Sequence, residues 1–188
     1  MMHLKAKSAL TIAAALIAVF LVPACKQMTA DDLKNALEVT DVRTVWVSKY
    51  YQPWPPRLSL VPQITFTVKN VGDQPLRFVN FNAVFKSKGD EENMGDGFLA
   101  TIRDRALKPG ETYDPITLTS NYGVEGRNLE HIKGNPMWKP TEIRLFASSK
   151  GSRPALLGEW DVSRDIDFQE PEDPTEIKTD ASEPDRDT

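Results

Sequence analysis

Apolar and polar residues alternate most regularly between residues 58 and 68. The apolar positions of this segment are Leu58, Leu60, Ile64, Phe66 and Val68. The same alternation returns in residues 76–86, with apolar residues at Val79, Phe81, Ala83 and Phe85. Such alternation is typical of strands that bury one face and expose the other. Because turn-forming residues at 70–75 separate the two segments, we predict that they pair as a β-hairpin.

Five further segments have the β-branched and aromatic composition of strands: residues 42–51, 98–102, 113–118, 143–147 and 156–162. Proline-rich and glycine-rich breaks separate some of them, and residues 120–140 form a long irregular stretch. Short strands at this spacing predict an all-β fold, a β-sandwich of about seven strands. Pro62 falls on the apolar face of the strand at 58–68, which predicts an edge position or a bulge there.

The first 25 residues have the features of an export signal. Lys5 and Lys7 precede an apolar run at residues 9–22, and a small residue precedes Cys25. The run is shorter than the ~20 residues that a membrane-spanning helix needs. We therefore predict a signal peptide at residues 1–24.

Val22-Pro23-Ala24-Cys25 resembles the lipobox of bacterial lipoproteins, in which the cysteine receives the lipid. Cys25 is also the one cysteine of the chain. The resemblance implies that the mature protein begins at Cys25 and is tethered to a membrane by acyl chains on that residue. Lys26 is similar to the residue found at this position in outer-membrane-sorted lipoproteins. That similarity implies the periplasmic face of the outer membrane as the location.

A second resemblance covers residues 64–119. This segment contains Val-Lys-Asn at 68–70, Gly-Asp-Gln-Pro-Leu at 72–76, Lys-Gly at 88–89 and Leu-Lys-Pro-Gly-Glu at 107–111. It is similar to bacterial FxLYD-type domains and to the related LEA14-like sandwiches. The resemblance implies an immunoglobulin-like β-sandwich and brings no catalytic residues with it.

Charge is unevenly distributed along the chain. Residues 25–168 carry 19 basic and 19 acidic residues, whereas residues 169–188 carry eight acidic and two basic ones. The balanced body lacks the basic patch that a nucleic-acid partner requires. The acidic segment is rich in proline and poor in apolar residues, so we predict that it is disordered. The predicted organisation is a signal peptide at 1–24, a lipidated tether at 25–37, the sandwich at 38–168 and a disordered acidic tail at 169–188.

Catalytic and metal-binding patterns are weak. His131 is the one histidine left after removal of the signal peptide, and the chain has no Gly-x-Ser-x-Gly motif. The acidic residues at 90–96 could bind calcium, but Met94 stands where an oxygen ligand is needed, and a loop tip explains them equally well. Met94, Met137 and His131 could bind copper(I) only if folding brought them together. We predict no catalytic residue, no metal site and no cofactor.

These observations favour a lipid-anchored cell-envelope lipoprotein that is not an enzyme. It would act as a non-catalytic protein-binding or structural module whose partner is another envelope protein. The alternatives are a periplasmic carrier of a small ligand or metal and, less favoured, a hydrolase.

Two aromatic and proline-rich loops, at residues 50–56 and 135–140, suggest where a partner binds. The candidate surface residues are Tyr50, Tyr51, Trp54, Tyr122, Met137 and Trp138. Aromatic residues and methionine are enriched at interface cores, and proline reduces the entropy that a loop loses on binding. The competing interpretation is that Trp54 and Trp138 lie under the ends of the sandwich and close its core.

Overall fold

The computed structural model describes residues 28–171, which form nine strands and two helices. One sheet contains β1 (Leu37–Gln52), β2 (Arg57–Asn70), β5 (Thr112–Thr119), β6 (Val124–Gly126) and β9 (Ile166–Asp167). The other contains β4 (Gly95–Ile102), β3 (Val79–Ser87), β7 (Thr141–Ser148) and β8 (Ala155–Asp161). The helices are α2 (Ala30–Ala36) and α3 (Leu129–Lys133). The predicted signal peptide, Cys25 and residues 172–188 lie outside the described residues.

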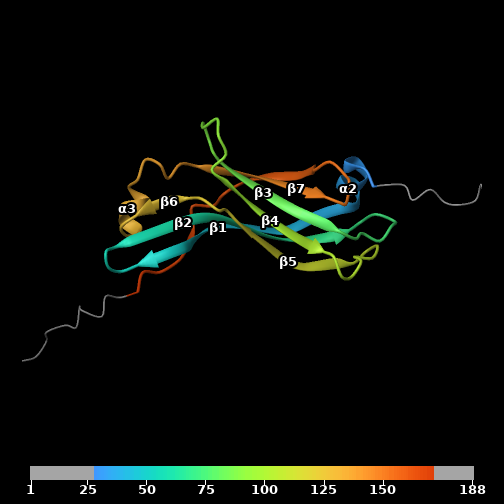
Figure 1. The fold of residues 1–188 in the computed structure, drawn as a ribbon, viewed down its shortest axis with the longest axis horizontal. Helices are drawn as coiled ribbons and strands as arrows, with labels where there is room; N and C mark the ends of the chain where they lie inside the picture. The colour runs from blue at the N-terminus through green and yellow to red at the C-terminus, as the bar shows by residue number, and fades with distance from the viewer. Residues whose placement is uncertain (1–27, 172–188) are drawn as a thin grey trace, which may run out of the picture.

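The predicted all-β sandwich is confirmed. Among the described residues, seven strands are seven residues long or longer, three in the first sheet and four in the second. The two sheets lie face to face along the long axis of the molecule (Figure 1). β3 illustrates why these residues form strands, because its side chains alternate without exception between buried and partly exposed positions.

The core lies between the two sheets. The rings of Phe66 on β2 and Phe81 on β3 meet there edge to face, with centroids 5.6 Å apart, and both side chains are fully buried. Aromatic pairs in this geometry add stability beyond the area that they bury. The alternating apolar positions therefore identify the inner faces of both sheets correctly.

The predicted hairpin between residues 58–68 and 76–86 is wrong. β2 pairs with β1 on one side and with β5 and β6 on the other, while β3 pairs with β4 and β7. The connection after Asn70 crosses from one sheet to the other, as the connection between the second and third strands does in immunoglobulin-like sandwiches. Phe66 and Phe81 consequently face each other across the core instead of lying side by side.

Pro62 is neither at a sheet edge nor at a bulge, because β2 is an inner strand. β6 pairs with β2 up to Leu60, and β5 pairs with it from Gln63 onward. The carbonyl oxygen of Pro62 accepts a hydrogen bond from the Ser120 N–H at 2.9 Å, in the gap between these two partner strands. A strand residue points its N–H and C=O to the same side, so the missing N–H of proline falls where no ladder bond is required.

The folded unit begins before residue 38. Thr29 and Asp32 form a capping box at the start of α2, with reciprocal backbone-to-side-chain hydrogen bonds of 3.0 and 3.1 Å. Leu33 on this helix is completely buried in the core. The second half of the predicted tether therefore packs as part of the domain. No helix within residues 28–171 is long and apolar enough to cross a membrane.

The stretch at 120–140, predicted to be irregular, contains β6 and α3. Asn128 caps α3 by accepting a hydrogen bond from the His131 N–H at 2.8 Å. These two short elements lie at the same end of the sandwich as the turn between β1 and β2, whereas α2 lies at the opposite end (Figure 1). We call these the hairpin end and the α2 end.

Candidate functional site

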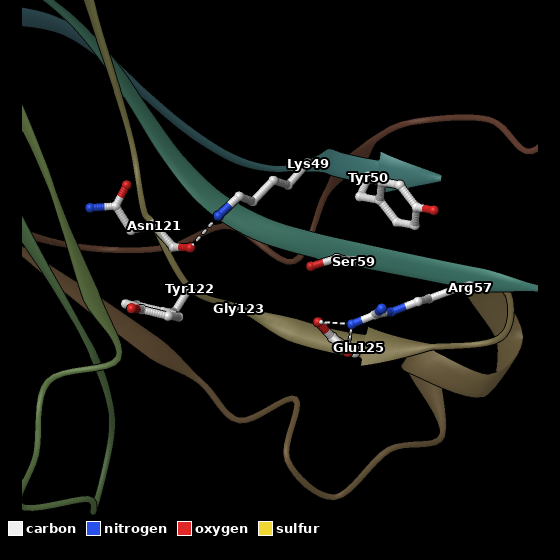
Figure 2. Close-up of a pocket in the computed structure, with 8 residues that line it drawn as sticks. All are labelled: Lys49, Tyr50, Arg57, Ser59, Asn121, Tyr122, Gly123 and Glu125. Carbon is white, nitrogen blue, oxygen red and sulfur yellow. Dashed lines mark hydrogen bonds and ion pairs between the residues drawn. The ribbon is translucent and has the colours of Figure 1, made fainter. Parts of the chain in front are cut away.

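An open groove of about 410 Å³ lies on the outward face of the first sheet at the hairpin end. Strands β1, β2 and β6, together with the chain leading into β6, form its walls. The residues that line it are Lys49, Tyr50, Arg57, Ser59, Asn121, Tyr122, Gly123 and Glu125. Figure 2 shows two cationic side chains that reach from β1 and β2 toward the segment at 121–125.

A β-bulge directs Lys49 into the groove. The register between β1 and β2 shifts between Ser48 and Tyr50, which leaves Lys49 as the extra residue. Its ammonium group donates a hydrogen bond to the Asn121 carbonyl oxygen at 2.6 Å and lies 5.9 Å from the centre of the Tyr122 ring. The bulge thus joins the hairpin to the Tyr122 side of the groove.

Arg57 forms the second link across the groove. Its Nη2 lies 3.0 and 3.2 Å from the two carboxylate oxygens of Glu125 on β6. The guanidinium carbon also lies 5.9 Å from the centre of the Tyr50 ring. Because both charged groups are exposed, the ion pair contributes at most about 1 kcal/mol to folding. Its main effect is to hold the guanidinium beside the aromatic ring.

Gly123 allows the segment at 121–125 to lie close to β2. A Cβ atom at this position would stand 1.9 Å from the Leu60 carbonyl oxygen, so no other residue fits without moving the backbone. The preceding turn is held by a hydrogen bond of 3.3 Å from the Tyr122 N–H to the Ser120 Oγ. The Tyr122 ring is consequently presented to solvent at the edge of the groove.

The predicted surface residues separate into exposed and buried sets. Tyr50 and Tyr122 line the groove, and Trp54 lies in the adjoining turn between β1 and β2. Trp54 is 84% exposed, Tyr122 69%, Met137 62% and Tyr50 44%. The interpretation that Trp54 closes the core is therefore wrong, because nothing in the described chain covers its ring.

Trp138 does not belong to the candidate surface. It is only 8% exposed, because its ring packs edge to face on Trp46, with centroids 6.0 Å apart. The Arg164 guanidinium lies 5.0 Å from the centre of the same ring. Tyr51 also turns inward, is half-buried and packs 5.4 Å from the Phe168 ring centroid. These two residues close the core at the hairpin end, as the competing interpretation held for Trp138.

Met137 lies apart from the main groove. Together with Met94 and residues 89–93 it lines a second open groove beside the connection between β3 and β4. His131, the third residue of the copper hypothesis, is on α3 and not in that lining. Within residues 28–171 no cluster of three or more His, Cys, Asp or Glu side chains could hold a metal ion. Asp90 of the calcium hypothesis instead pairs with Lys139 at 2.6 Å.

Sequence reasoning missed the polar residues of the groove, chiefly Lys49, Arg57 and Glu125. Two consecutive tyrosines at 50 and 51 interrupt simple alternation, and this irregularity is the signal that could have suggested the bulge at Lys49. Nothing local in the sequence indicates that β6 pairs with β2, so the contact between Arg57 and Glu125 was not predictable.

No protein-family model and no curated protein matches the chain. Several solved structures show limited similarity to it, and three of them follow. A Bordetella pertussis protein assigned as ApaA is 16% identical with a TM-score of 0.36, and the match covers 68% of this chain and 93% of that one. The structural genomics target SoR45 is 14% identical with a TM-score of 0.40, over 70% and 89% of the two chains. An Archaeoglobus fulgidus protein is 12% identical with a TM-score of 0.32, over 67% and 98%. Similarity of this degree does not indicate a shared function.

Proposed function

We propose that the protein is a lipid-anchored, non-catalytic binding module of the cell envelope. Its hairpin end engages another envelope protein. The observation that carries the proposal is the gathering of exposed aromatic side chains, Tyr50, Trp54 and Tyr122, at one end of the sandwich. Large aromatic residues supply much of the affinity of protein interfaces, whereas most of a soluble surface carries few of them.

The rigid backbone that carries these three aromatic side chains supports a binding role. Each is held by backbone that is fixed independently: Tyr50 by the ladder with β2, Tyr122 by the close approach at Gly123, and Trp54 by its turn. The Gln52 Nε2 donates a hydrogen bond to the Trp54 carbonyl oxygen at 2.8 Å. Aromatic groups on a preorganised backbone lose little conformational freedom when a partner binds.

The position of the groove suits an anchored protein. Met28, the first described residue, follows Cys25 by three positions and precedes α2. The turn between β1 and β2 and strand β6, which border the groove, lie at the opposite end of the sandwich (Figure 1). If Cys25 carries the lipid, the molecule holds its aromatic end away from the membrane, toward proteins in the periplasm. We propose the periplasmic face of the outer membrane as its location.

A crosslinking experiment in cells tests this function. A photoreactive amino acid placed at Trp54 or Tyr122 should form a discrete crosslinked product with an envelope protein, identified by mass spectrometry. Trp54→Ala and Tyr122→Ala should each weaken capture of that partner at least about tenfold, since an interface aromatic often contributes more than 1.4 kcal/mol.

Phe98→Ala is the matched control, because Phe98 is an exposed aromatic on β4 of the other sheet. It should leave capture unchanged. Equal losses for all three variants, or crosslinks that appear only from the Phe98 face, would contradict the assignment of the hairpin end. A small molecule retained by the purified protein and released by Tyr50→Ala would favour a carrier instead.

A further inference from the structure

Two cations, Lys49 and Arg57, and one anion, Glu125, line the groove. Three exposed cations, Lys49, Arg57 and Arg127, lie along β1, the start of β2 and the exit of β6. Glu125 lies among them, and Glu130 follows on α3. Glu125 binds Nη2 of Arg57, and within residues 28–171 no acceptor is found for Nε or Nη1 of that guanidinium. An additional carboxylate could therefore bind Arg57 without displacing Glu125.

The C-terminal part of the described chain arrives at the same end of the molecule. After β9 it passes Tyr51, where Phe168 packs, and reaches the start of α3 at Leu129. There the Glu170 carboxylate accepts a hydrogen bond from the Leu129 N–H. An acidic side chain of this segment is thus already bound at the start of α3, two residues after Arg127 in the sequence.

The remaining distance to the groove is short compared with the chain that follows. Leu129 is six residues from Gly123 in the groove wall, so the two positions are at most about 22 Å apart. Seventeen residues follow Pro171 in the sequence and can extend to about 56 Å. This segment can reach the groove and lie along its whole length.

The chemistry of residues 172–188 complements the groove. They contain seven acidic and two basic residues and two prolines. Carboxylates fit the free N–H groups of Arg57 and the ammonium group of Lys49. Proline rings dock readily on exposed aromatic faces such as those of Tyr50 and Tyr122.

We propose that the acidic segment 172–188 docks into the groove of its own chain and competes there with the partner. This inference rests on the proposed function, since it concerns regulation of the same site. Because the segment is part of the same chain, its effective concentration at the groove is near the millimolar range. Weak contacts are therefore sufficient for docking. A segment that occupies the groove about nine-tenths of the time raises the apparent Kd of the partner about tenfold.

A spin label reports this contact directly. In the otherwise full chain, Cys25→Ser removes the one cysteine and Asp180→Cys introduces a site for a nitroxide label. Backbone amide signals of Lys49, Ser59 and Tyr122 should broaden at low salt and recover as salt screens the charges. Signals of Phe98, on the other sheet, should stay sharp.

Two variants of the labelled chain show whether the contact is specific. Replacing the acidic residues of 172–188 by their amides should abolish the broadening, and so should Arg57→Gln combined with Tyr50→Ala. Phe98→Ala is the control and should leave the broadening intact. Broadening spread evenly over the surface, centred on another face, or insensitive to the amide replacements would overturn the proposal.

This experiment contains no partner, so it can fail independently of the proposed function. If the groove signals stay sharp while Trp54→Ala still weakens capture of the crosslinked partner, docking of the segment is excluded and the binding role stands. If the segment docks but its removal leaves partner capture unchanged, competition is excluded. If removal of residues 172–188 raises partner capture about tenfold, both docking and competition are supported.

Discussion

The two ends of the sandwich hold their polar side chains in different ways. At the α2 end, Asn70 is completely buried and its side chain is fully engaged. Its Nδ2 donates to the carbonyl oxygens of Gln74 and Leu107, both at 2.9 Å, and its Oδ1 accepts from the Gly72 N–H at 3.0 Å. At the hairpin end, large aromatic side chains stand in solvent beside charged groups that are only partly paired.

This difference indicates that the α2 end mainly stabilises the fold and that the hairpin end is available for binding. The α2 end joins two connections, from β2 to β3 and from β4 to β5, through one satisfied amide, which stabilises a single arrangement of the loops. The hairpin end leaves aromatic surface exposed on fixed backbone, which adds little to folding but is available for binding. Substitutions at the two ends should therefore affect different measurements.

The largest expected effect concerns attachment at the α2 end. Cys25→Ser removes the proposed acceptor of the lipid, and the apolar run before it is too short to span a membrane as a helix. Fractionation of cells should show complete loss of acyl-dependent membrane association while the domain stays folded. Mass spectrometry that finds the wild-type Cys25 thiol unmodified would refute the anchor.

Two tryptophans at the hairpin end provide a direct comparison between burial and exposure. Trp138→Ala leaves a cavity against Trp46 and should cost ~3–5 kcal/mol of unfolding free energy. Trp54→Ala removes an exposed ring and should change stability by less than about 0.5 kcal/mol. Urea denaturation of both variants measures the difference, and similar losses would show that Trp54 is packed.

Asn70→Ala tests the satisfied amide of the α2 end. It removes the hydrogen bonds to the carbonyl oxygens of Gln74 and Leu107 and the one from the Gly72 N–H, at an expected cost of ~1–3 kcal/mol. Asn82→Ala on β3 is the matched control. The buried Oδ1 of Asn82 has no partner among the described residues, so its removal should cost under about 0.5 kcal/mol. Thermal melts in which the control loses as much would contradict this account.

The smallest effect concerns pH at the turn beside Asn70. A backbone hydrogen bond from the Lys108 N–H, assisted by the nearby Arg105 guanidinium, lowers the pKa of Glu111 below its usual 4.5. A carboxyl with a lowered folded-state pKa stabilises the protein above its unfolded pKa, and this contribution disappears as the pH falls through the folded-state value. The melting temperature of wild type should thus exceed that of Glu111→Gln at neutral pH, and the gap should close under acid conditions.

Strand positions were more predictable than strand partners. The segment predicted at 58–68 corresponds to β2 (Arg57–Asn70), because alternation records directly which side chains face the core. Alternation contains no information about which strand lies alongside. A hairpin and a crossing between sheets bury the same residues of β2 and β3, so the error in pairing left the predicted core intact.

The candidate site was predictable only in part, for a related reason. Trp54 and Trp138 both lie in short proline-rich segments, yet one is exposed and the other buried. Their burial depends on Trp46 and Arg164, which are distant in sequence. The ion pair of Arg57 likewise depends on a strand of three residues that propensity alone does not reveal.

β1 also determines how the molecule carries a mechanical load. This strand of 16 residues runs from α2 to the aromatic turn, a length of about 53 Å. Its thirteen register pairs with β2 lie perpendicular to that direction. A pull between the N-terminal end and the turn between β1 and β2 runs along the backbone of β1, which is already extended, so the covalent chain carries the force and the ladder stays closed. If the proposed anchor and the proposed partner hold the two ends, the molecule resists extension in this orientation.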